Sequence, residues 1–88
     1  MTWNVTLTRQ AGKQLTRLPR TVQDLADLAI TDLEQQGLYP RGWDTLKTAH
    51  GEYRLRLNYR YRMRYRQSEP GKLEIEVFYL GHRSEAYK

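Results

Sequence analysis

The chain alternates arginine with tyrosine, leucine or methionine across residues 52–66, EYRLRLNYRYRMRYR. A period of two places successive side chains on opposite faces of a strand. The segment therefore predicts strands at 52–57 and 60–67, with one apolar, aromatic face and one face of guanidinium groups. Six arginines against one acid give it a local charge of +5, which equals the formal net charge of the whole chain. Such a face suits a polyanion, and RNA is the first candidate.

The composition is that of one small globular domain. A chain of 88 residues supports a single modest core, so residues 1–88 are treated as one domain. Cysteine is absent and histidine occurs twice, so we expect no disulfide, metal site or cofactor. There is no apolar run of membrane-spanning length and no basic start followed by an apolar stretch. We therefore expect a cytoplasmic protein without membrane contact.

The first half of the chain predicts a strand and two helices. Residues 3–7 alternate apolar and polar side chains, which indicates a strand. Apolar residues spaced for one helical face predict a short helix over 11–18. A second helix is predicted from an N-cap at Thr21 to a stop at Gly37. Residues 38–51 carry proline and glycine breakers, so they are expected to be irregular.

A further strand at 72–79 gives the element order β-α-α-β-β-β. This order predicts an α+β fold in which a two-helix hairpin packs on one face of a mainly antiparallel four-stranded sheet. A short C-terminal segment, residues 81–88, follows the last strand.

The register of the last hairpin assigns partners to two arginines. Directly opposed residues of antiparallel strands share a face, so the apolar residues of both strands must match. With a loop at residues 69–71, Arg66 falls opposite Glu74 and Arg64 opposite Glu76. Both arginines are therefore predicted to form cross-strand ion pairs.

The same register leaves Arg62 without an acid, because it falls opposite Phe78. In the preceding hairpin, the alternation of faces places Arg62 opposite Arg56 if the loop is 58–60, or opposite Arg54 if the loop is 57–59. Like charges directly opposed cost stability, so a sequence selected only for folding would avoid them. We therefore predict that Arg54, Arg56 and Arg62 form a cluster that binds phosphate.

Two residues near the C-terminus are further candidates. His82 follows Gly81 near the end of the predicted last strand and could transfer a proton near neutral pH, although an exposed or capping histidine is the alternative. Tyr87 could stack on a base or orient a phosphate.

The two arginine strands and the closing segment resemble the RelE/ParE superfamily of bacterial toxins. The closing residues 77–87, VFYLGHRSEAY, are similar to that family's strand, Gly-x-Arg and final tyrosine. The resemblance covers nearly the whole chain. It implies the toxin of a type II toxin–antitoxin pair, of the RelE branch. Such a toxin is a ribosome-dependent endoribonuclease that cuts messenger RNA in the A site, without a metal, by attack of the ribose 2′-hydroxyl on the adjacent phosphate.

The resemblance also implies partners and roles for individual residues. The partners are a cognate antitoxin, the 70S ribosome and messenger RNA. The implied catalytic residues are Arg54, Arg56, Arg62, His82, Arg83 and Tyr87. The implied RNA-binding residues are Arg54, Arg56, Arg60, Arg62 and Arg64. Because arginine stays protonated, the general base is left open, with His82 as a candidate. The general acid is His82 or Arg83.

Two other functions remain in view. A ParE-like inhibitor of DNA gyrase would share the fold without nuclease chemistry. A non-catalytic RNA-binding module would use the arginines only to neutralise phosphate.

Overall fold

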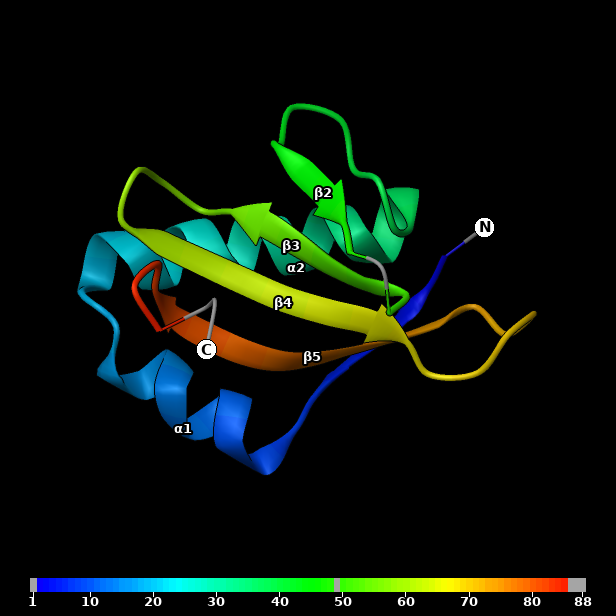
Figure 1. Cartoon of the computed structure of the whole chain (residues 1–88), viewed down its shortest axis with the longest axis horizontal. Coiled ribbons are helices and arrows are strands. Elements are labelled where there is room, and N and C mark those ends of the chain that lie inside the picture. Colours follow the sequence, from blue (N-terminus) through cyan, green and yellow to red (C-terminus); the bar gives the residue numbers. More distant parts are fainter. Residues whose placement is uncertain (1, 49, 86–88) are drawn as a thin grey trace.

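The computed structural model describes residues 2–48 and 50–85. Two helices and five strands follow one another as β1 (Asn4–Leu7), α1 (Arg9–Arg17), α2 (Arg20–Gln36), β2 (Thr45–Lys47), β3 (Glu52–Arg56), β4 (Tyr61–Gln67) and β5 (Glu74–His82). The strands form one sheet in the order β1-β5-β4-β3-β2, in which β1 runs parallel to β5 and the other neighbours are antiparallel. Figure 1 looks onto the face of this sheet that lies opposite α2.

The predicted α+β fold is confirmed, with one strand more than predicted. The additional strand, β2, lies in the segment that was predicted to be irregular. It pairs with β3, with Thr45 opposite Leu55 and Lys47 opposite Tyr53. A strand of three residues is too short to show an alternating pattern, so only its pairing with β3 reveals it.

The two helices begin at different kinds of cap. Thr8 caps α1, because its hydroxyl oxygen accepts a hydrogen bond from the Ala11 amide at 3.1 Å. The predicted N-cap of α2 at Thr21 is wrong, since α2 starts at Arg20 and its N-cap, Pro19, lies two residues before Thr21. The Pro19 carbonyl accepts the first helical bonds, from Val22 and Gln23, both at 2.9 Å. The fixed φ of proline sets the start of the helix without a side-chain cap.

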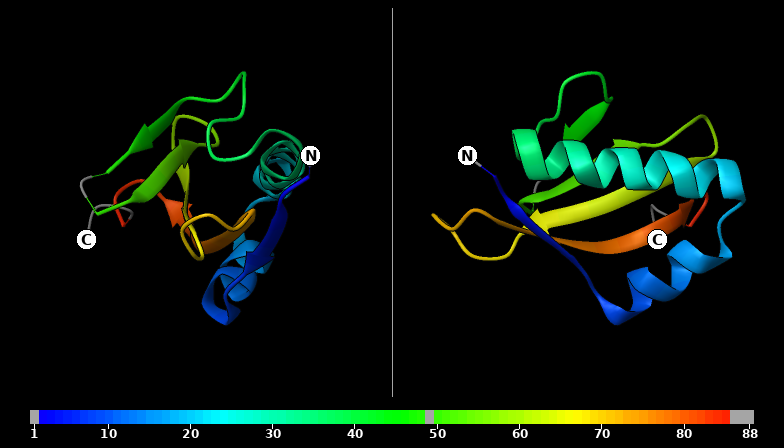
Figure 2. Two further views of the ribbon diagram at one scale, coloured as in Figure 1. Left: turned by 90° about the vertical axis from the view of Figure 1, so that its right-hand side faces the viewer. Right: turned by 180° about the vertical axis from the view of Figure 1, so that it is seen from behind.

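The core lies between the helices and one face of the sheet. The sheet contributes Leu55, Met63, Tyr65, Ile75 and Val77, all 0% exposed. The helices contribute Ala11, Leu18, Val22, Ala26, Ala29 and Leu33. Seen from behind, α2 crosses the sheet on this side (Figure 2). The opposite face, which carries the arginines of β3 and β4, is left open.

The hairpin of β3 and β4 follows one of the two predicted registers. Arg56 lies opposite Arg62, and Arg54 lies opposite Arg64. The like-charged pairs that parity predicted in this hairpin are therefore present.

The hairpin of β4 and β5 departs from its predicted register. Arg66 lies opposite Glu76 instead of Glu74, and Gln67 lies opposite Ile75. The turn is therefore longer than the predicted loop at 69–71. A shift of two residues preserves parity, so Ile75 still faces the core.

A β-bulge then changes the register again. It lies at Arg64 and Tyr65, and beyond it Arg64 lies opposite Tyr79 and Arg62 opposite Gly81. Phe78 is the additional residue, so the predicted pairing of Arg62 with Phe78 is wrong. A bulge inserts one unpaired residue, which no count by twos can reveal.

Substitution of Gly37 is expected to disturb the contact between the end of α2 and Trp3, the residue before β1. A Cβ at Gly37, whose φ is +86°, would lie 2.7 Å from the Trp3 indole Nε1. Gly37→Ala should therefore lower the free energy of unfolding by more than about 1 kcal/mol, measured by chemical denaturation. Gly42→Ala is the matched control, because φ is +87° there and no atom lies within 4 Å of the added Cβ. Equal losses in the two variants would contradict a role for the Trp3 contact.

Candidate functional site

A pocket of about 200 Å³ lies between β2, β3 and β4. Its lining includes all three arginines of the predicted cluster, Arg54, Arg56 and Arg62, together with Asp44, Thr45 and Leu46. The structure thus brings the three arginines together, and their roles in catalysis and RNA binding stay predictions. Three neighbouring guanidinium groups form a strongly anion-attracting site, since each presents a planar fork of donors that matches phosphate oxygens.

Arg62 is the buried member of the pocket, with only 5% of its surface exposed. Its Nη1 donates to three backbone carbonyls of the loop between β3 and β4: Asn58 at 2.7 Å, Tyr61 at 3.1 Å and Tyr59 at 3.2 Å. No carboxylate in residues 2–48 and 50–85 forms an ion pair with it. Arg62 therefore holds the loop closed and its charge is fixed at the pocket wall.

Asp44 is a pocket residue that sequence reasoning missed. Its carboxylate Oδ2 lies 3.6 Å from Arg56 Nε, and its carbonyl accepts from the Arg56 amide at 3.0 Å. Both side chains are well exposed, at 69% for Asp44 and 51% for Arg56. Only the unpredicted strand β2 brings Asp44 beside β3, so no local pattern signals its place in the site.

The segment that leads to Asp44 is tied to the core. The Trp43 indole Nε1 donates to Asp32 Oδ2 on α2 at 2.8 Å. The Tyr65 hydroxyl donates to the Leu38 carbonyl at 2.5 Å. Burial raises the pKa of the Tyr65 phenol beyond its usual range, so the hydroxyl remains a donor. Both bonds fix the approach to the pocket.

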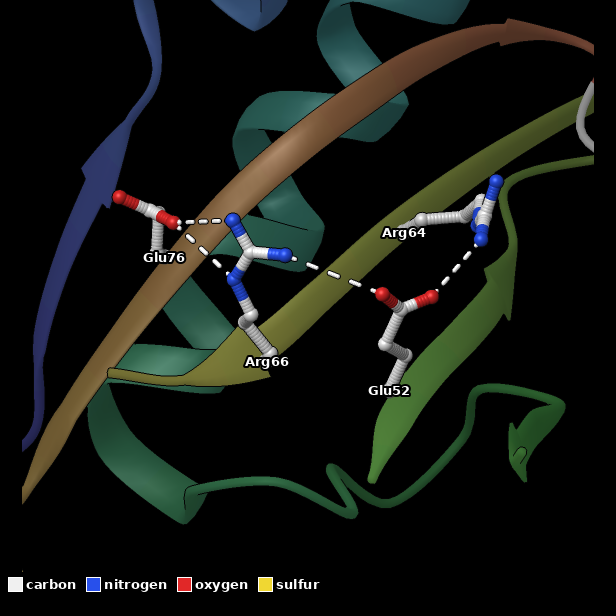
Figure 3. A network of polar contacts seen from close by, with 4 residues as sticks. All are labelled: Glu52, Arg64, Arg66 and Glu76. Atoms are coloured by element: carbon white, nitrogen blue, oxygen red, sulfur yellow. Dashed lines mark hydrogen bonds and ion pairs between the residues drawn. The ribbon is translucent and has the colours of Figure 1, made fainter. Parts of the chain in front are cut away.

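The remaining strand arginines are paired with acids, as Figure 3 shows. Arg66 donates to Glu76 at 2.8 Å. It was predicted to form a cross-strand ion pair, which is confirmed, but the predicted partner was Glu74. Arg64 was predicted to pair with Glu76 but instead donates to Glu52 at 2.8 Å, because the register is shifted. Glu52 also lies 3.8 Å from Arg66. Two arginines and two glutamates therefore form a neutral network beside the pocket, which we call the ion-pair network.

This network occupies the guanidinium of Arg64. Only 18% of the Arg64 side chain is exposed, and its guanidinium lies 5.1 Å from the centre of the Phe78 ring. The predicted RNA contact of Arg64 would require it to leave Glu52.

The C-terminal candidates lie at the end of the sheet that carries the loop held by Arg62. His82 lies opposite Tyr61, with their ring centres 5.6 Å apart. The Arg83 amide donates to the Arg60 carbonyl at 2.7 Å, and the Arg83 guanidinium lies 4.4 Å from the centre of the Tyr59 ring. Arg60 is exposed on the same loop. The predicted residue Tyr87 lies outside the described residues.

The ring of His82 is oriented by the turn that follows it. Its Nδ1 accepts from the Ser84 amide at 3.2 Å and lies 3.0 Å from the Ser84 hydroxyl oxygen. A nitrogen that accepts this bond carries no proton, so the neutral ring holds its proton on Nε2. His82 is exposed and thus offers an N–H donor at the surface.

Gly81 allows Tyr79 to pass across the last strand. The Tyr79 hydroxyl donates to the His82 carbonyl at 3.0 Å, and a Cβ at Gly81 would lie 2.6 Å from that hydroxyl oxygen. Burial, with a smaller contribution from Glu85, raises the pKa of Tyr79, so the phenol stays a donor. A side chain at position 81 would therefore displace the Tyr79 ring.

Solved structures identify the architecture that carries this site. The RelE–RelB complex from Pyrococcus horikoshii is 25% identical over 97% of this chain and 99% of that chain, with a TM-score of 0.77. The chain has the fold of the RelE-like toxins. No protein-family model matches the chain, and no curated protein matches it in sequence.

Two further RelE-like structures are similar over most of their length. The YoeB–YefM toxin–antitoxin complex from Staphylococcus aureus is 15% identical over 92% of this chain and 97% of that chain, with a TM-score of 0.72. A mutant of the E. coli toxin RelE in the free state is 18% identical over 98% of this chain and 87% of that chain, with a TM-score of 0.65. At this identity the RelE-like neighbours show a shared fold, whereas the site has to be argued from this chain's own residues.

No helix within residues 2–48 and 50–85 is long and apolar enough to cross a membrane. The same residues contain no group of three or more metal-ligating side chains.

Removal of the buried guanidinium is expected to destabilise the fold. Arg62→Ala removes the donor to the Asn58 and Tyr59 carbonyls and one of the donors to the Tyr61 carbonyl, so the free energy of unfolding should fall by about 2–3 kcal/mol. Arg60→Ala is the control on the same loop, because Arg60 is exposed, and should change it by less than about 0.5 kcal/mol. Thermal and urea unfolding measure both. Wild-type stability of Arg62→Ala would contradict the role assigned to these three bonds.

Proposed function

We propose that the chain is the toxin of a type II toxin–antitoxin pair and a metal-independent endoribonuclease that cleaves messenger RNA on the ribosome. One observation supports this above all others: on a RelE-like fold, Arg54, Arg56 and Arg62 line a single pocket. Its cations lie on the open face of the sheet, where a phosphodiester can enter.

The arginines act through their charge. When the ribose 2′-oxygen attacks the adjacent phosphorus, the O2′–P bond forms and the bond to the 5′-oxygen breaks. Negative charge develops on the non-bridging oxygens in the transition state. Cations that are already in place stabilise this charge without reorganisation, and one well-placed donor contributes about 10²–10³ in rate. Arg62 is pre-organised in this sense, because the loop carbonyls hold its guanidinium.

Asp44 is proposed as the general base. The reaction must remove a proton from the 2′-hydroxyl, and guanidinium groups cannot accept it. Among the described residues that line the pocket, Asp44 carries the only carboxylate. Its ion pair with Arg56 would keep that carboxylate close to the bound phosphate.

His82 is proposed as the general acid. The departing 5′-oxygen needs a proton, and the imidazolium form of His82 would donate it from Nε2, while Nδ1–H donates to the Ser84 hydroxyl oxygen 3.0 Å away. Arg83 lies beside the loop of Arg62 and would neutralise the phosphate that follows.

A cognate antitoxin is the proposed regulator. The archaeal RelE neighbour is solved with RelB and the staphylococcal YoeB neighbour with YefM. A chain of net charge +5 with an open arginine face would bind an antitoxin that carries an acidic segment. A toxin that acts on messenger RNA and the 70S ribosome would work in the cytoplasm.

Neutralisation of Arg56 tests the nuclease. Arg56→Gln removes a pocket cation whose side chain is half exposed, so the fold should be retained. We expect A-site cleavage to slow by about 10²–10³-fold. Single-turnover cleavage on programmed ribosomes, read by primer extension, measures the rate.

Arg66→Gln is the matched control for Arg56→Gln. It removes the same charge from the same sheet face, in the ion-pair network outside the pocket. It should cleave within a few-fold of wild type. Equal slowing in both variants would mean that general charge, not the pocket, drives cleavage. Wild-type binding to ribosomes with no cleavage under any condition would favour the non-catalytic RNA-binding module.

Substitution of Asp44 separates chemistry from binding. Asp44→Asn removes the proposed base, so single-turnover cleavage should fall by about 10²–10⁴-fold. RNA affinity should stay the same or rise, because one negative charge leaves the pocket. Asp27→Asn, an exposed carboxylate on α2, is the control with the same charge change. Unchanged cleavage in Asp44→Asn would exclude Asp44 as the base.

A further inference from the structure

The exposed side of α1 carries three cations in a row. Arg9, Lys13 and Arg17 follow one another at intervals of four residues, and all three are exposed. Residues four apart lie on the same helical face, so the row spans about 12 Å along the helix axis. We call it the α1 row. In the part of the chain that the structure describes, no ion pair joins any of the three to a carboxylate. Arg20, in contrast, lies 3.5 Å from Asp24.

The α1 row opposes the stability of its own helix. Like charges four residues apart repel each other, and the row contains two such pairs. The first turn of α1 has no acid, and Arg9 stands at the helix N-terminus, where the helix dipole disfavours a cation. The helix dipole favours Arg17, in the last turn, but helix formation gives no reason for Arg9 and Lys13, whereas an anionic partner accounts for all three.

The core holds the α1 row in a fixed position. Ala11 is fully buried, and the Gln14 side-chain oxygen accepts a hydrogen bond from the Leu80 amide of β5 at 2.9 Å. This bond places the middle of α1 beside the end of β5 that carries His82. In Figure 1, α1 lies along β5, on the side away from β3. The row is therefore a second basic surface, separate from the pocket on β3 and β4.

The side chains around the row indicate the class of partner. The exposed residues of α1 are all polar: Arg9, Gln10, Lys13, Thr16 and Arg17. The exposed large apolar residues lie elsewhere, at Leu28, Tyr39, Leu46, Tyr59 and Leu73. Protein interfaces have an apolar or aromatic centre, whereas nucleic-acid interfaces are polar and strongly positive. Single-stranded RNA is bound by stacking on aromatic side chains, and the exposed face of α1 carries none.

We propose that the α1 row binds the phosphate backbone of double-helical RNA, as a contact separate from the cleavage pocket. The proposal deepens the function proposed above, because the ribosome presents such helices to a toxin that works on it. Lysine and arginine would contact phosphates, and the exposed Gln10 amide would donate to phosphate or ribose oxygens. The row would then orient the toxin, while the pocket would handle the scissile phosphate.

A charge-matched pair of triple variants tests the row. The row variant combines Arg9→Gln, Lys13→Gln and Arg17→Gln. The control variant combines Arg20→Gln, Arg41→Gln and Lys72→Gln, three exposed cations elsewhere. Each set removes three positive charges, which lowers the formal net charge from +5 to +2. Any difference between the two therefore reports the place of the charges and not their number.

The probe is a blunt RNA duplex of about 16 base pairs. Its dissociation constant is measured between about 50 and 200 mM salt. The logarithm of the binding constant falls linearly with the logarithm of the salt concentration. The row variant should reduce the magnitude of this slope by about 2–3 relative to wild type, since each lost phosphate contact removes about 0.7–0.9. The control variant should change the slope by less than about 1. The row variant should melt no lower than wild type, because two repulsive pairs are removed.

Three outcomes would overturn the proposal. Equal slope changes in both triple variants would assign duplex binding to net charge. An unchanged slope in the row variant would mean that the α1 row does not contact the duplex and is only a solvated helix face. Intact duplex binding with loss of a co-expressed acidic antitoxin would assign the row to a protein partner.

Wild-type cleavage on programmed ribosomes, measured in parallel, separates this proposal from the nuclease. A slope change in the row variant without any wild-type cleavage supports the row and overturns only the nuclease. Wild-type cleavage with an unchanged slope in the row variant overturns only the row.

Discussion

The hydrogen bonds that Arg62 donates to backbone carbonyls are the interaction on which the rest of the site depends. One buried guanidinium joins the carbonyls of Asn58, Tyr59 and Tyr61, and thereby closes the hairpin of β3 and β4. The closed loop fixes Arg56 opposite Arg62 and carries the tyrosine ring on which Arg83 lies. A buried charge is costly unless its donors are satisfied, and here backbone carbonyls satisfy it without neutralising it. The pocket thus keeps a full positive charge at a fixed place.

The open face of the sheet divides into a neutral half and a charged half. Glu52 and Glu76 hold Arg64 and Arg66 in the ion-pair network, so these two cations are already occupied. In the pocket, Arg56 forms an ion pair with Asp44, whereas no carboxylate in residues 2–48 and 50–85 pairs with Arg62. This division confines the strong anion-binding potential to one end of the face. A uniform arginine sheet would bind any polyanion along its whole length, whereas a confined pocket can select one phosphate.

Particular residues show how far prediction from sequence reached. The alternation in residues 52–66 predicted which side chains enter the core, and parity predicted that Arg62 would face Arg56 or Arg54. The alternation of faces did not predict the pairing around Phe78, because a bulge inserts one unpaired residue there and shifts every pairing beyond it. Asp44 was missed because β2 is a strand only through its pairing with β3. The burial of Arg62 was also missed, since no local pattern reports which carbonyls a long side chain can reach.

The sequence by itself determined the two faces of the sheet and the set of cations on the outer one. It could do so because side-chain direction along a strand is a local property with a period of two. Tertiary structure alone decided which arginines are neutralised, which one is buried and which carboxylate joins them. These outcomes depend on the register of β4 against β5, on the pairing of β2 and on the path of the loop after β3. Each is set by contacts between residues distant in the chain, so the stretch 52–66 could show its charge without showing its division into a neutral network and an arginine-lined pocket.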